Sequence, residues 1–180
     1  MKPRPEDTRA WVACVVRSGL DEPADVLQQV VEAIRADHPE LDAATTALDW
    51  IATAREDWLL DARSWPRVTD HDRLTEVFAS LEESEVVVLQ GCADHWAARD
   101  ELKRRTPRPR GIAWFTPADV WHAVDEGMLE VNLWHGDTAN AAAGDALLDE
   151  VIETFESLQL EAHFDEGRIE VAAYWQRRPE

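Results

Sequence analysis

The chain has 180 residues, 45% of them hydrophobic, which suffices for one folded domain with a sizeable core. Its 37 acidic and 18 basic residues give a formal net charge of -19 at pH 7, and such a field repels nucleic acid and anionic membrane surfaces. There is no CxxC pair, no signal-peptide segment at the N-terminus and no apolar run long enough to span a membrane, so we expect a soluble, cytoplasmic protein without a disulfide framework.

The first part of the chain predicts helices. Capping residues and apolar positions at helical spacing place four of them, over about residues 7–19, 21–38, 42–63 and 69–81. Ser64-Trp65-Pro66 ends the third and longest helix. We therefore expect a helical N-terminal lobe over residues 1–67.

The second part of the chain alternates strands and helices. Short apolar runs predict strands at 86–89, 111–115 and 129–134, and helical patterns follow them at 94–105, 116–124 and 139–158. The chain closes with a hairpin around Asp165-Glu166-Gly167. The order predicts an α+β fold, with a helical N-terminal part followed by a mixed sheet of about five strands whose helices pack mainly on one face. No flexible linker separates residues 1–67 from the α+β lobe at 68–180, so we expect the two lobes to share one core.

Nine tryptophans are present, several times the usual number. Four fall on inward-facing positions of the predicted elements and are expected in the core: Trp58, Trp114, Trp121 and Trp175. Three others lie at the edge of an apolar pattern or on the more polar face of a predicted strand: Trp50, Trp65 and Trp134. They are candidates for a partner-binding surface, because exposed indole rings are favoured interface anchors. Partial burial under a loop is the alternative for these three.

Histidines with acidic neighbours are candidate metal ligands. His135 with Asp137, and His163 with Asp165, have the i, i+2 spacing that puts two side chains on one face of an extended segment. An acidic chain also places acids beside histidines by chance, and no HExxH or paired Cys/His motif is present. We therefore expect no bound cofactor and keep these four residues as weak metal candidates.

A possible reactive centre lies near Cys92. This cysteine follows a predicted buried strand, His95 comes just behind it, and Asp119 follows the next strand. A nucleophilic thiol needs a base within reach and a lowered pKa, whereas an inert, half-buried thiol is the alternative. The run from Lys103 to Arg110 is the only basic cluster, and it either binds an anion or pairs with neighbouring acids.

Part of the sequence resembles a known family. Thr69-Asp-His-Asp-Arg-Leu, Gly111-Ile-Ala-Trp-Phe, Gly127-Met-Leu-Glu-Val-Asn-Leu and Ile169-Glu-Val-Ala-Ala-Tyr-Trp-Gln-Arg-Arg are similar to an uncharacterised domain of unknown function that is common in actinobacteria, over roughly residues 68–178. The resemblance implies a His-Gln-Asp pattern after the second strand, of which only Asp119 is present here. It supports the fold and assigns no activity.

The sequence favours a non-catalytic, acidic protein-binding domain. Its partner would be a basic protein that it neutralises, as an immunity protein does, without direct contact to nucleic acid or membrane. Two alternatives are an enzyme or metal-binding protein built around Cys92, His95 and Asp119, and a mimic of nucleic-acid charge. A salt-loving host would produce the same acidity.

Overall fold

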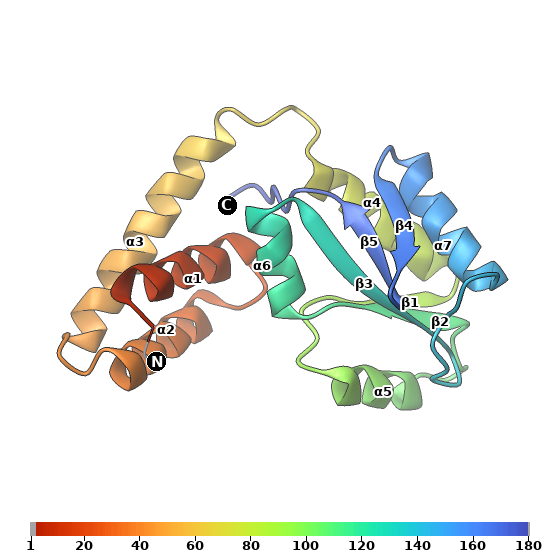
Figure 1. The fold of residues 1–180 in the computed structure, drawn as a ribbon, viewed down its shortest axis with the longest axis horizontal. Coiled ribbons are helices and arrows are strands. Elements are labelled where there is room, and N and C mark those ends of the chain that lie inside the picture. Colours follow the sequence, from red (N-terminus) through yellow and green to blue (C-terminus); the bar gives the residue numbers. More distant parts are fainter. Residues whose placement is uncertain (1–2, 180) are drawn as a thin grey trace. The chain divides into compact units, whose positions relative to one another are not determined.

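A computed structural model of the protein describes residues 3–179, which divide into two compact units (Figure 1). The helical unit contains the chain up to Pro66 together with the C-terminal tail from Arg177, and the α+β unit spans Arg67–Gln176. The tail thus groups with the helical unit, whereas the sequence placed all residues from 68 onward in the second lobe. A core shared by the two lobes stays a prediction.

The helical unit contains three helices, α1 (Pro5–Ser18), α2 (Pro23–Asp37) and α3 (Ala43–Ala62). Helices α1 and α2 have prolines in their first turns, where the N–H that proline lacks would have no partner within the helix. The Asp42 side chain caps α3 by accepting a hydrogen bond from the backbone N–H of Thr45. The first helix begins before its predicted cap. Asp7 lies inside its first turn and accepts from the Arg4 backbone.

The core of the helical unit forms where α1 and α2 pack on α3. Aliphatic and small side chains fill it, namely Val12, Val30, Ile34, Ala47 and Ala54. One polar pair is buried among them, Thr8 and His38, whose hydroxyl and imidazole Nε2 are 2.8 Å apart. This bond satisfies two polar groups that burial would otherwise leave unpaired.

The α+β unit confirms the predicted fold class, with a mixed five-stranded sheet following the helical part. Its elements are α4 (Asp70–Glu83), β1 (Val86–Leu89), α5 (His95–Arg104), β2 (Gly111–Trp114), α6 (Pro117–Asp125), β3 (Met128–His135), α7 (Ala146–Ser157), β4 (Glu161–Asp165) and β5 (Arg168–Ala172). The strand order is β1-β2-β3-β5-β4. The pair β1–β2 is parallel, and the other pairs are antiparallel.

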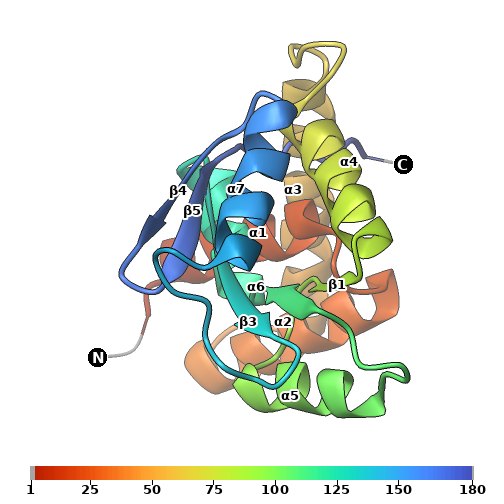
Figure 2. The same cartoon turned by 90° about the vertical axis from the view of Figure 1, so that its right-hand side faces the viewer.

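One face of this sheet carries most of the buried strand side chains. Leu129, Val131, Ile169 and Val171 lie there, and α4 and α7 pack together over it (Figures 1 and 2). Helix α5 packs on β2 from the other face, where it covers Ile112, Trp114 and Cys92. The alternation of apolar and polar residues along β3 decides which side chains of this strand are fully buried, because successive side chains point to opposite faces of the sheet.

Two elements near the end of the unit test the predicted boundaries. The hairpin turn at Glu166-Gly167 is confirmed, and both residues have the positive φ that such a turn requires. The long helix predicted over 139–158 is wrong over residues 139–145, because α7 begins only at Ala146. Residues before it form a loop in which Asn140 pairs with Trp134 as an isolated bridge.

Within residues 3–179, none of the helices combines the length and the apolar character that crossing a membrane requires.

Candidate functional site

Cys92 lies just beyond β1, held by a 2.8 Å hydrogen bond from its backbone N–H to the carbonyl of Phe115. Its side chain is 3% exposed, and the thiol donates to the backbone carbonyl of Asp94 at 3.0 Å. Burial raises the pKa of the Cys92 thiol. A neutral, covered thiol with this bond is a packing residue rather than a nucleophile.

The two proposed helpers of Cys92 have other contacts. His95 is exposed at the start of α5, with its ring centroid 4.6 Å from that of Trp96. Asp119 closes the capping box of α6, where its Oδ2 accepts from the backbone N–H and the hydroxyl of Thr116 at 2.6 and 2.7 Å. No hydrogen bond or ion pair within residues 3–179 joins Cys92, His95 and Asp119, so the structure does not bring together the residues of the alternative reactive centre.

The two histidine–aspartate pairs do not form either. His135 pairs with Asp145 at 3.0 Å, because β3 ends at His135 and Asp137 lies in the following turn, where it accepts from the backbone of Ala139. On β4, His163 and Asp165 do share a face, but the imidazole of His163 lies 3.3 Å from Glu170 on the neighbouring strand.

In the part of the chain that the structure describes, no three side chains of His, Cys, Asp or Glu are grouped in a way that could hold a metal ion. The weak metal candidates therefore do not gain a third ligand from the tertiary structure.

The tryptophans divide differently from the prediction. Trp50 is 8% exposed and packs edge-on against His38, so of the two alternatives for this candidate the structure has burial and not a place on the surface. Trp65 and Trp134 are half-buried, and the ring of Trp134 packs on Trp114 with centroids 5.1 Å apart. Of the tryptophans expected in the core, Trp121 is half-buried and the other three are buried: Trp58, Trp114 and Trp175.

Sequence reasoning missed the most exposed tryptophan among residues 3–179. Trp96 on α5 is 57% exposed, and the guanidinium of Arg99 lies 5.7 Å from its ring centroid. The signal was available, since Ala98 and Leu102 mark the buried face of α5 and Trp96 falls on the opposite side.

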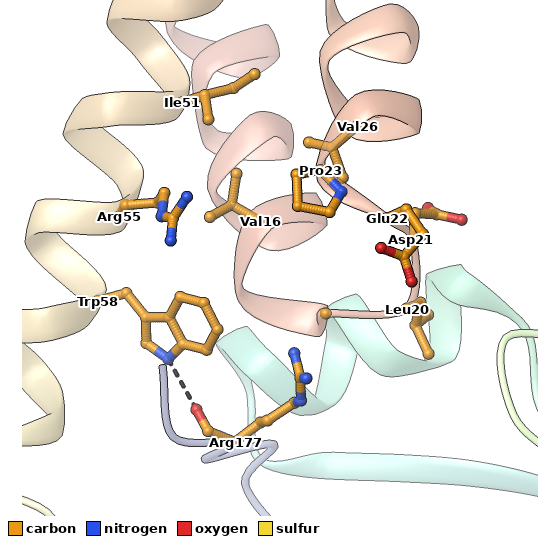
Figure 3. Close-up of a pocket in the computed structure, with 11 residues that line it drawn as sticks. Val16, Leu20, Asp21, Glu22, Pro23, Val26, Ile51, Arg55, Trp58 and Arg177 are labelled. Atoms are coloured by element: carbon orange, nitrogen blue, oxygen red, sulfur yellow. Dashed lines mark hydrogen bonds between the residues drawn. The ribbon is translucent and has the colours of Figure 1, made fainter. Parts of the chain in front are cut away.

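A pocket of about 350 Å³ lies within the helical unit (Figure 3). Figure 3 shows Arg55 and Trp58 of α3 on one side, Pro23 and Val26 of α2 on the other, and the side chain of Arg177 at the lower edge. The indole N–H of Trp58 donates to the carbonyl of Arg177 at 2.8 Å, which fixes the C-terminal tail as one wall.

The lining of this pocket combines an apolar floor with charges of both signs. Val16, Val26 and Ile51 supply apolar surface, and Asp21 and Glu22 lie across from Arg55. A pocket of this size and lining suits a small molecule that carries an apolar group and charged ends.

The basic run from Lys103 to Arg110 is partly neutralised by nearby acids. Glu101 accepts from Arg104 and Arg105, and Arg110 pairs with Glu150 at 2.9 Å. Arg110 holds the pKa of the Glu150 carboxyl below its usual value through this hydrogen bond. These three arginines therefore pair with neighbouring acids, as one of the two alternatives has it. Lys103 and Arg108 lie elsewhere in the run, so the other alternative, binding of an anion, stays open.

Comparison with known proteins places the chain in a family. The model of a domain of unknown function, DUF6891, matches residues 3–179. The match includes the three N-terminal helices, so the resemblance expected over residues 68–178 was too short. No curated protein and no solved structure matches the chain. The matched segment spans both units, and the chain belongs to the DUF6891 family.

Proposed function

We propose that this protein is a non-catalytic binding domain that recognises and neutralises a basic protein, in the manner of an immunity protein. The net charge of -19 supports an encounter with a cationic partner, because opposite charges accelerate association and suppress wrong partners. We place this encounter in the cytoplasm. The abundance of arginine over lysine fits a GC-rich host such as an actinobacterium, where the partner should be sought.

The observation that carries the proposal is the outward face of α3. Six large apolar side chains are exposed among residues 3–179, and three of them lie on this helix: Leu48, Leu59 and Leu60, at 59%, 49% and 57%. The buried residues Ala47, Trp50, Ala54 and Trp58 define the opposite side. Helix α3 thus carries exposed leucines in addition to its buried side, whereas a helix that packs on one side only is usually polar on the other.

Acidic side chains accompany the exposed leucines. Asp49 and Glu56 are exposed between Leu48 and Leu59, and helical geometry places them on the same outward face. Arg55 is the single basic residue within α3. A face that interleaves leucines with acids matches a partner surface on which apolar side chains alternate with lysine or arginine.

The leucines and the acids of this face would contribute differently to binding. The leucines would supply affinity by losing water-exposed apolar area, and the acids would supply rate and selectivity. The half-buried Trp65 and Trp134 stay candidates for additional contacts, whereas Trp50 does not.

The test uses a defined probe, a synthetic amphipathic helix made of leucine and lysine. We expect it to shift the backbone amide NMR signals of α3, and to bind more weakly as salt rises. Replacing Leu48 and Leu59 by serine together should weaken binding by at least about tenfold, the equivalent of ~1.4 kcal/mol. The matched control replaces Val68 and Trp96, two exposed apolar residues elsewhere, by serine and should bind like the unaltered protein.

A host protein that is captured by the unaltered chain and by the control, but not by the Leu48/Leu59 variant, would support the proposal further. Circular dichroism checks that each variant is folded. Signal changes spread evenly over acidic residues, with affinity unchanged in both double variants, would show that charge alone holds the peptide. Equal losses in the two double variants would show that any exposed apolar side chain contributes. Either result would reject the α3 surface.

The alternatives receive less support from the geometry. A catalytic role for Cys92 requires a thiolate, whereas burial and its bond to Asp94 favour the neutral thiol. A mimic of nucleic-acid charge requires a continuous row of acids, and the α3 face interleaves its acids with leucines.

A further inference from the structure

The basic residues of the α+β unit are gathered in one place. Apart from Arg67, Arg73 and Arg168, every basic residue of this unit lies between Arg99 and Arg110. The rest of the unit is strongly acidic, so this segment is a local exception in an otherwise negative field.

Four of these cations surround one hollow of about 530 Å³. It lies between the C-terminal half of α5, the loop that follows it and the turn after β3, and its cationic lining consists of Arg99, Lys103, Arg105 and Arg108. Asp137 is the acid in the lining, and Thr106 and Thr138 add hydroxyl groups. The carboxylate of Asp137 accepts from the backbone of Ala139 at 3.0 Å, so one of its oxygens is hydrogen-bonded within its own turn, and the four cations outnumber this single acid.

The walls of the hollow are held together through the backbone. Gly136 donates to the carbonyl of Arg110 at 2.9 Å. A side chain at position 136 would place its Cβ 2.1 Å from the carbonyl oxygen of Pro109, so only glycine allows the turn and the loop to approach this closely. The loop that carries Arg105 and Arg108 is therefore attached to the turn after β3 through its backbone.

The cations that line the hollow are incompletely neutralised. Lys103 has a 3.4 Å contact with exposed Asp100, and Arg105 bonds to Glu101. Arg99 lies over the ring of Trp96, which is a contact that leaves its charge uncompensated. Arg108 has no ion pair or hydrogen bond among the residues that the structure describes.

The helix dipole accounts for only part of this cluster. Lys103 lies in the last turn of α5, where a positive charge offsets the negative end of the helix. Arg108 lies beyond the helix, where that effect has faded. Arg108 lines the hollow together with Arg99 and Arg105. This arrangement instead fits a bound anion that is a separate molecule and not an acidic side chain of the protein.

We propose that this hollow binds a compact, multiply charged anion, a small molecule that carries phosphate groups. Guanidinium groups bind phosphate oxygens through paired, charge-assisted hydrogen bonds, and the hollow has a volume in the range of small-molecule sites. An extended nucleic acid would have to cross the acidic surface around the hollow, whereas a compact anion would not. This site is separate from the α3 surface and does not depend on it.

The experiment measures binding of inorganic triphosphate to the full chain by calorimetry and by NMR. We expect binding that weakens with salt, with signal changes at Arg99, Lys103 and the 105–108 loop. Arg108→Gln should lower the affinity by at least about tenfold, and the double variant with Arg99→Gln by more. Arg35→Gln is the matched control, since it removes an exposed arginine from the helical unit with the same change in charge.

Three results would overturn the proposal. The first is no binding of triphosphate at low salt. The second is an equal loss of affinity in Arg35→Gln and Arg108→Gln, which would mean that only net charge matters. The third is tighter binding of a single-stranded oligonucleotide than of triphosphate, which would assign the cations to nucleic acid.

Discussion

The indole N–H of Trp58, near the C-terminal end of the chain's third helix, donates a 2.8 Å hydrogen bond to the backbone carbonyl of Arg177, 119 residues later. The indole itself is 7% exposed. This bond and the packing around it attach the C-terminal tail to the helical unit, although the residues just before the tail belong to the α+β unit. The two ends of the chain are thereby coupled in one structural unit.

Replacing Trp58 should therefore destabilise the protein far more than replacing an exposed tryptophan. We expect Trp58→Ala to lower the free energy of unfolding by about 3–5 kcal/mol through loss of packing, and Trp58→Phe by about 1 kcal/mol through loss of the hydrogen bond. Trp96→Ala, the control, should change it by less than about 0.5 kcal/mol. Denaturant unfolding followed by circular dichroism measures all three, and similar losses for Trp58→Ala and Trp96→Ala would contradict the structure.

Asp119 should behave as a helix cap and not as a functional group. Thr116→Ala and Asp119→Ala should each destabilise the protein by about 1 kcal/mol, because each removes bonds to the first turn of α6. The two losses should not add in the double variant, since the residues form one capping box. Strict additivity in thermal or denaturant unfolding would mean that Asp119 acts elsewhere.

The bond between His135 and Asp145 predicts a pH effect at a single carboxyl group. His135, and then the backbone N–H of Ala142, hold the pKa of Asp145 below its usual value. Since the pKa is lower in the folded state, the bond stabilises the fold above the unfolded pKa of about 3.9, and this contribution is lost as the pH falls through the folded pKa.

An NMR titration of the side-chain carboxyl carbons tests this effect. His135→Ala should raise the pKa of Asp145 toward its usual value, with part of the shift kept by Ala142. The pKa of Glu150, held low by Arg110, is the control: it should stay unchanged in His135→Ala and rise in Arg110→Gln. An Asp145 titration that is identical with and without His135 would disprove the bond.

Cys92 should be chemically inert in the folded protein. With Cys14→Ala as background, we expect the Cys92 thiol to react with a thiol reagent at least about a hundredfold more slowly in the native state than in denaturant, because it is covered and its pKa is raised. Rapid native reaction near neutral pH would indicate an accessible thiolate and would revive a catalytic role for this residue.

The sequence by itself determined the elements that depend on local patterns. Alternation along β3, the Thr69 and Thr116 caps and the turn at Glu166-Gly167 are all visible in neighbouring residues, so the α+β class and most boundaries could be predicted. The one long error, the start of α7, arose because Ala139–Asp145 has helix-forming alanines, whereas the loop is fixed by the bridge from Asn140 to Trp134.

Only the tertiary structure decided which side chains meet. It gave His135 to Asp145 rather than to Asp137, buried Trp50, exposed Trp96 and drew four cations around one hollow. The physical reason is that a side chain's partners depend on how distant backbone segments approach one another. Gly136 shows this directly, since its lack of a side chain lets two loops touch and so sets the position of the cations beside them.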